Sequence, residues 1–290
     1  MTAASRVRIA AVAALTTLLA LPAAGMAAGA EFDPSEEFKL DPWVSIELGP
    51  LDLSINKAVF YLFLASVICI AMGLVIRGGL KMKPTKSQNI VEMAYEFAEK
   101  QIARPTLTTS VYNRYFPYIA TLFLFILVSN LVSFIPLPVS HASWIGPIPD
   151  FALYAATANI NVTLALTVVT FLVYNYEGVR AHGVLGYLKT LVPDAPKAIQ
   201  PIIFGIEVLS QILRLVSLSV RLFANLLAGH LLIIMAAGFM VLLGNFFGLI
   251  ALPVGVFFWV FEWLLVAGLQ AFIFAMLSGI YIGFAVESSH

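Results

Sequence analysis

Long apolar segments separated by short polar ones dominate this chain. Predominantly apolar runs cover residues 58–76, 116–135, 159–176, 201–243 and 253–286. A helix needs about 20 such residues to cross the hydrocarbon core of a bilayer, and each run reaches or approaches that length. The pattern predicts an all-α, polytopic membrane protein with about five transmembrane helices.

The last two apolar runs are longer than a single perpendicular crossing requires. As continuous helices, 201–243 and 253–286 would extend about 64 Å and about 50 Å at about 1.5 Å per residue. The hydrocarbon core is only about 30 Å thick. Either each run breaks into a hairpin, or both form long, steeply tilted helices. We expect two long tilted helices, although the sequence leaves the hairpin open.

A different periodicity appears between the first two runs. Residues 87–103 place their apolar side chains largely on one side of a helix and three glutamates mostly on the other. An amphipathic helix of this kind is typical of segments that lie in the membrane interface.

The N-terminus has the pattern of a signal peptide. Residues 1–30 contain Arg6 and Arg8, an apolar run of about 16 residues and the sequence Ala28-Gly29-Ala30, which is typical of a cleavage site. The alternative is an uncleaved additional span, for which the run is short. Residues 31–57 are acidic and contain three prolines, which predicts an external segment. The membrane domain would then comprise residues 58–290.

The distribution of basic residues predicts the orientation. Lysine and arginine cluster in 77–114 and recur in 177–200, whereas 137–157 and 240–255 contain none. Loops rich in these residues stay on the cytoplasmic side. We therefore expect a multi-pass protein of the cell (inner) membrane, with its N-terminus outside and its C-terminus in the cytoplasm.

Composition narrows the function further. The chain has 290 residues, is 61% hydrophobic, 11% charged and has no net charge, so nothing favours nucleic acid as a partner. Its single cysteine, Cys69, excludes an internal disulfide. We expect no metal and no cofactor.

Charged side chains nevertheless occur inside the fourth apolar run. An ionised group at the centre of a bilayer costs about 3 kcal/mol on insertion scales, so each one is a candidate functional residue. Successive steps of three or four residues place six polar side chains on one helical face: Glu207, Gln211, Arg214, Ser217, Arg221 and Asn225. His230 follows Arg221 by nine residues, on the opposite face and about 13.5 Å further along.

The last apolar run contains possible counterparts. Glu262 precedes Gln270 by eight residues, or about 12 Å of helix. If the two helices are antiparallel with Gln270 level with Arg221, Glu262 comes level with His230. Depth matching therefore predicts a Glu–His pair towards the outside and an Arg–Gln pair at mid-depth.

These segments resemble one known family. SLSVRLFANLLAGH, LQAFIFAMLSGIYI and PYIATLFLFILVSNLVSFIP are similar to signature segments of the a-subunit of F-type ATP synthases, and PTKSQNIVEMAYEF and NVTLALTVVTFL also fit. The resemblance extends from about Asn56 to the C-terminus. It implies a non-catalytic stator subunit of the Fo motor that conducts protons to and from a rotating ring of c-subunits, with the b-subunit stalk and lipid as further partners.

The resemblance also implies roles for individual residues. Arg221 would be the arginine that faces the rotor carboxylate and separates two half-channels, with Gln270, Asn225 and Ser217 as polar neighbours. Glu207 would be a carboxylate on the cytoplasmic exit path, or alternatively a partner of Arg214.

His230 and Glu262 would relay protons on the outer side, which suits an imidazole that titrates near neutral pH. Glu262 lies eight residues before Gln270, whereas the family pattern leads us to expect seven. The extra residue would turn Glu262 by about 100° on a regular helix.

Other functions stay open at this point. A sodium-translocating form of the same subunit would share these features, because the ring determines most of the ion selectivity. A secondary transporter would require an internal repeat, which the sequence lacks. A structural membrane scaffold would tolerate apolar replacement of Arg221 and His230.

Overall fold

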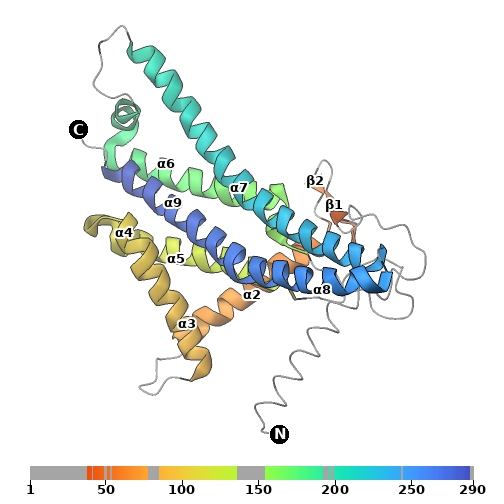
Figure 1. The fold of residues 1–290 in the computed structure, drawn as a ribbon. Helices are drawn as coiled ribbons and strands as arrows, with labels where there is room; N and C mark the ends of the chain where they lie inside the picture. The colour runs from red at the N-terminus through yellow and green to blue at the C-terminus, as the bar shows by residue number, and fades with distance from the viewer. Residues whose placement is uncertain are drawn as a thin grey trace.

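Figure 1 shows the computed structural model of the chain as a set of long helices. The structure describes residues 38–40, 42–48, 51–52, 54–77, 85–135, 154–191, 196, 199–242 and 244–287. The α-helices are α2 (Lys57–Arg77), α3 (Lys86–Phe97), α4 (Arg104–Thr106), α5 (Thr109–Val132), α6 (Ile160–Thr190), α7 (Gln200–Leu242), α8 (Gly244–Phe261) and α9 (Ala267–Glu287). The described residues also contain two π-helical segments, η2 (Ala98–Ala103) and η5 (Glu262–Val266), and a 3-10 turn, η4 (Ala156–Ala158).

In the described part of the chain, five helical segments are long and apolar enough to cross a membrane: Lys57–Val75, Val111–Val132, Ile160–Thr190, Gln200–Ala236 and Pro253–Val286. This finding agrees with the predicted number and order of spans. Large exposed side chains on these helices, such as Phe63 and Ile70 on α2 and Leu172 on α6, are apolar. Such surfaces are compatible with lipid rather than water.

Neither of the two long C-terminal runs folds into a hairpin. α7 is a single helix of 43 residues, and the last run continues from α8 through the π turn η5 into α9. α7 packs along α8, and α6 packs against both α7 and α9. Figure 1 shows α6, α7 and the α8–α9 helix extending alongside one another and converging at the α8 end.

The predicted polar loop at 177–200 is wrong for its first part, because α6 continues to Thr190. Gly183 interrupts this helix with φ = 70°, a backbone conformation that glycine adopts without a steric penalty. After the turn, the ring of Tyr187 returns to Gly178, where an added Cβ would lie 2.3 Å from the ring. The Tyr187 hydroxyl donates to Asn175 at 2.9 Å. The chain thus folds back at the end of the third span instead of leaving it as a loop.

The amphipathic segment forms α3 and continues through η2 into α4. Thr85 caps α3 by accepting a hydrogen bond from the Gln88 amide. At the other end, Thr106 packs onto two glycines of α9, since a Cβ on Gly279 would lie 2.4 Å from its hydroxyl. A Cβ on Gly283 would lie 2.8 Å from its carbonyl oxygen. This close contact fixes the segment to the last helix.

The central hydrophobic core lies where α5, α6, α7, η2 and α9 meet. Its most buried large side chains are Ile102, Ile119, Ile126, Leu222, Leu226, Phe274 and Ile282. A second cluster joins α2 to the end of α5 around Tyr61 and Val128. These contacts hold α7 and α9 in the antiparallel arrangement that depth matching requires.

Before α2, a short antiparallel hairpin pairs β1 (Glu47–Leu48) with β2 (Leu51–Asp52). The acidic, proline-containing composition of residues 31–57 predicted an external segment but no strands. The predicted signal peptide, residues 1–30, lies outside the described residues.

Candidate functional site: a buried acid–imidazole pair and an arginine-lined cavity

His230 and Glu262 are in direct contact, as depth matching predicts. Nδ1 of His230 lies 2.9 Å from Oε1 of Glu262 and 3.1 Å from the Leu226 carbonyl oxygen. That carbonyl can only accept, so Nδ1 carries a hydrogen. Each of the two residues is 2% exposed. The second polar atom of each side chain, Nε2 or Oε2, is buried without a hydrogen-bond partner among the described residues.

The neighbouring residues make room for this pair and enclose it. A Cβ on Gly229 would lie 2.1 Å from Cδ of Glu262, so only glycine leaves space for the carboxyl group. The Phe134 ring lies 5.2 Å from the His230 ring, and Trp259 packs edge-on against Phe134. Aromatic side chains thus separate the pair from its surroundings on this side.

The π turn η5 explains how Glu262 reaches His230 despite the eight-residue spacing from Gln270. On a regular α-helix, eight residues turn a side chain by about 80° from its starting face, whereas seven turn it by only about 20°. A π turn bonds residue i to i+5 and so accommodates one additional residue. Glu262 begins the π turn, and the additional residue restores its orientation towards α7.

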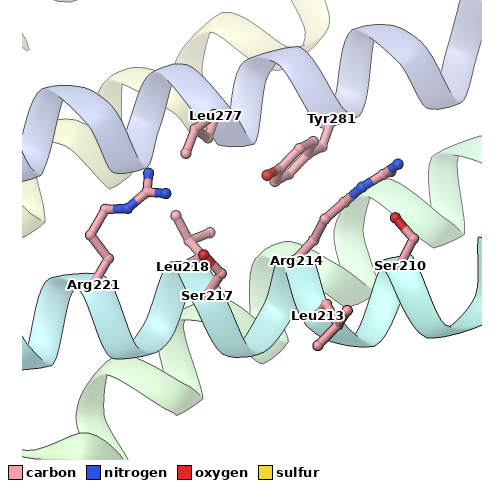
Figure 2. A pocket seen from close by; sticks show the side chains of 8 residues that line it. All are labelled: Ser210, Leu213, Arg214, Ser217, Leu218, Arg221, Leu277 and Tyr281. Atoms are coloured by element: carbon pink, nitrogen blue, oxygen red, sulfur yellow. The ribbon is translucent and has the colours of Figure 1, made fainter.

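Arg221 lies on another face of α7. Its side chain is exposed and forms no hydrogen bond or ion pair with any of the residues that the structure describes. It lines a cavity of about 230 Å³ between α7 and α9. Figure 2 shows Arg221 at one end of this cavity and Arg214 at the other. The remaining lining residues are Ser210, Leu213, Ser217, Leu218, Leu277 and Tyr281.

Glu207 pairs with Arg214, the alternative that the sequence left open. Oε1 of Glu207 lies 3.3 Å from Nη2 of Arg214. The Gln211 amide donates to the same oxygen at 3.5 Å and accepts from the Tyr174 hydroxyl. The Arg214 guanidinium lies 5.8 Å from the centre of the Tyr281 ring. Glu207 thus belongs to a polar network one helical turn beyond the cavity.

The remaining predicted site residues are distributed differently. Ser217 lines the cavity, and Asn225 is exposed on α7. Gln270 is buried at 5% exposure, and no hydrogen bond joins it to Arg221. The predicted Arg–Gln pair is therefore not hydrogen-bonded in this structure, in which the arginine is exposed and the glutamine is buried.

Several contributors to the site were not predicted. Ser210 and Tyr281 line the cavity, Gly229 accommodates Glu262, and Asn130 contacts the end of the π turn. The eight-residue spacing was the only sequence signal for the π turn. Among the described residues, no group of three metal-ligating side chains comes together.

Comparison with known proteins identifies the family. The family model described as "ATP synthase A chain" matches residues 59–283. ATP synthase subunit a 2 of Chlorobaculum tepidum is 33% identical over 92% of this chain and 77% of its own length. ATP synthase subunit a 1 of Brucella anthropi and ATP synthase subunit a of Brucella ovis are each 34% identical, over 89% of this chain and 99% of theirs. Matches of this extent, together with the five membrane-spanning helices, show that the chain belongs to the ATP synthase A chain family, the non-catalytic proton-channel subunit of the Fo sector.

Proposed function

We propose that this chain provides two separate proton half-channels, an outer one through His230 and Glu262 and an inner one through the arginine-lined cavity. The observation that carries the proposal is the division of polar groups on α7. A buried acid–imidazole pair involves one face of α7. Arg221 lies on another face, nine residues away, where it is exposed and has no hydrogen-bond or ion-pair partner among the described residues.

The outer half-channel would deliver protons to the ring of c-subunits. Nδ1 of His230 and Oε1 of Glu262 share a hydrogen bond, and the other polar atom of each side chain has no partner in the described part of the chain. The two side chains share the hydrogen bond between Nδ1 and Oε1, while Nε2 and Oε2 have room for a further proton. Such a pair can take up a proton at one of these atoms and release it at the other. The relay role of both residues rests on this geometry.

Arg221 would separate the two half-channels. A guanidinium keeps its proton at all physiological pH values, and this one is exposed and unpaired among the described residues, so a carboxylate on a partner can approach it. An opposite charge at a few ångströms favours the ionised form of a carboxylate. A rotor carboxylate that passes Arg221 would therefore release its proton before it moves on.

The inner half-channel would receive that proton. Ser217, Ser210 and the Tyr281 hydroxyl line the cavity beyond Arg221, and Glu207 lies next to Arg214 at its far end. Together they provide hydroxyl and carboxylate groups from Arg221 towards the N-terminal end of α7. Asn225, exposed one turn beyond Arg221, would contact the ring, and buried Gln270 would support the helix packing behind it.

The orientation in the membrane follows from the distribution of lysine and arginine, and the partners and chain segments are proposed together with it. The N-terminus would lie outside and the C-terminus in the cytoplasm, in the cell (inner) membrane. The exposed face of α7 around Arg221 would contact the c-ring, and the b-subunit would be a further stator partner. Residues 1–30 would be a signal peptide, residues 31–57 an external segment and residues 58–290 the membrane domain.

Replacement of Arg221 tests the proposal directly. In membrane vesicles that contain the complete ATP synthase, Arg221→Ala should abolish ATP-driven acidification, followed by quenching of a pH-sensitive dye. Assembly should persist, because Arg221 is exposed and is not one of the buried core residues. Arg104→Ala is a matched control: Arg104 is also exposed, and its ion pair with Glu99 lies on the segment before α5. Normal acidification in the Arg221 variant would refute the mechanism.

A further inference from the structure

The π turn that orients Glu262 is attached to the rest of the protein by one buried side chain. Nδ2 of Asn130, on α5, lies 3.1 Å from the carbonyl oxygen of Ala267, the first residue after the π turn. Asn130 and Ala267 are both completely buried. The contact joins the second span directly to the point where α-helical geometry resumes in the last helix.

The orientation of the Asn130 amide follows from its two partners. The Ala267 carbonyl can only accept, so the NH₂ group must face it. The amide oxygen then faces Thr157 of η4, whose buried hydroxyl donates to it at 2.8 Å. Both hydrogen bonds are shielded from water. Loss of one partner would leave a buried polar group unsatisfied, which costs more free energy than the same loss at a surface.

A π turn requires support of this kind. π-helical segments are rare, and they occur mostly as single turns at functional sites. If η5 relaxed to α-helical geometry, the additional residue would turn Glu262 away from His230 by about 100°. The Asn130 bond to Ala267 fixes the C-terminal end of η5. Gly229 leaves space for Glu262 at its N-terminal end.

From this geometry we infer that Asn130 is a positioning residue, which holds the π turn and thereby keeps Glu262 in hydrogen-bond contact with His230. Thr157 orients Asn130 in turn. This inference rests on the proposed relay function of the pair. It assigns Asn130 no contact with the transported proton.

Asn130→Leu is the first test, because leucine has nearly the same shape as asparagine but cannot donate a hydrogen bond. Thr157→Val in the same chain removes the hydroxyl that would otherwise stay unpaired. The double variant should lower the initial rate of ATP-driven acidification about tenfold in vesicles, since a displacement of about 1 Å can cost far more than that. Ser129→Ala is the matched control, because Ser129 is equally buried and its hydroxyl has no partner among the described residues. It should leave the rate unchanged.

Deletion of Leu264 distinguishes positioning from a general structural role. Leu264 lies within η5 and is exposed, and its removal shortens the spacing from Glu262 to Gln270 from eight residues to seven. The π turn is then no longer needed, so the deletion should conduct normally and should restore acidification to the Asn130→Leu/Thr157→Val variant. A merely structural defect would persist in the deletion background.

Three results would overturn the inference. The deletion of Leu264 could fail to restore the acidification rate, the deletion alone could abolish transport, or Asn130→Leu/Thr157→Val could transport at the normal rate. Glu262→Gln in the same vesicles separates this result from the proposed function. If Glu262→Gln also transports normally, the relay itself is refuted, whereas a loss of transport in Glu262→Gln alone refutes only the role of Asn130.

Discussion

The two polar regions of α7 differ in how completely this chain encloses them. His230 and Glu262 are buried and contact each other, with Gly229 and Phe134 packed around them. Arg221, by contrast, is exposed and lines an open cavity with Arg214. One region is preorganised by the chain itself, and the other presents its charge outward.

This difference indicates where a partner is needed. A buried, paired site retains its geometry without help, because packing and hydrogen bonds determine each rotamer. An exposed guanidinium without a carboxylate partner in the described residues is complete only when another molecule supplies one. Changes in the enclosed region should therefore act through fit, and changes in the open region should act mainly through charge.

The largest effect in the enclosed region is expected from Gly229→Ala. The added methyl group would lie 2.1 Å from Cδ of Glu262, so the carboxyl group must leave its position against His230. We expect ATP-driven acidification to fall about 100-fold, the loss that a displacement of about 1 Å can cause. Gly268→Ala is the matched control, because nothing lies within 4 Å of its added Cβ. Similar rates in the two variants would show that the close contact does not matter.

Exchange of the pair should have an intermediate effect. His230→Glu combined with Glu262→His should transport protons faster than either single change, by several-fold, because only the double variant retains one acid and one imidazole in contact. The initial rate of dye quenching is measured in the two single variants and the double variant. The comparison of these rates is a double-mutant cycle. A double variant no faster than the slower single variant contradicts the functional pairing.

The smallest effect is expected in the open region, from Glu207→Gln. Glu207 and Arg214 are both partly exposed, and such ion pairs contribute only about 0–1 kcal/mol to stability. Assembly should be unchanged, and the acidification rate should fall by about two- to threefold through loss of one acceptor near the exit. Glu96→Gln on α3 is the control, since Glu96 is also exposed and paired, with Lys100. A loss as large as that of Gly229→Ala would remove the contrast between the two regions.

Much of this arrangement was accessible from the sequence because it depends on length and periodicity. The lengths of the apolar runs gave five spans, and a rise of about 1.5 Å per residue brought Glu262 level with His230. Such arithmetic gives the height of a residue along a helix more reliably than its direction. The same depth argument paired Arg221 with Gln270, yet the structure turns the first outward and the second into the core.

The features that were missed depend on the backbone or on tertiary contacts. The π turn has no periodicity of its own, and only its effect on spacing was visible. The turn at Gly183 continues α6 because Tyr187 can pack against Gly178, a contact that no local pattern indicates. The ion pair of Glu207 with Arg214 also depends on side-chain directions that the sequence left open.

The unbroken length of α7 has a mechanical consequence. Arg221 and His230 belong to the same uninterrupted helix, so a sideways displacement of the arginine by a moving partner would also displace the imidazole. Glu262 belongs to the other helix, at the start of the π turn. Under torque, a displacement of α7 relative to the last helix would therefore load the hydrogen bond between His230 and Glu262.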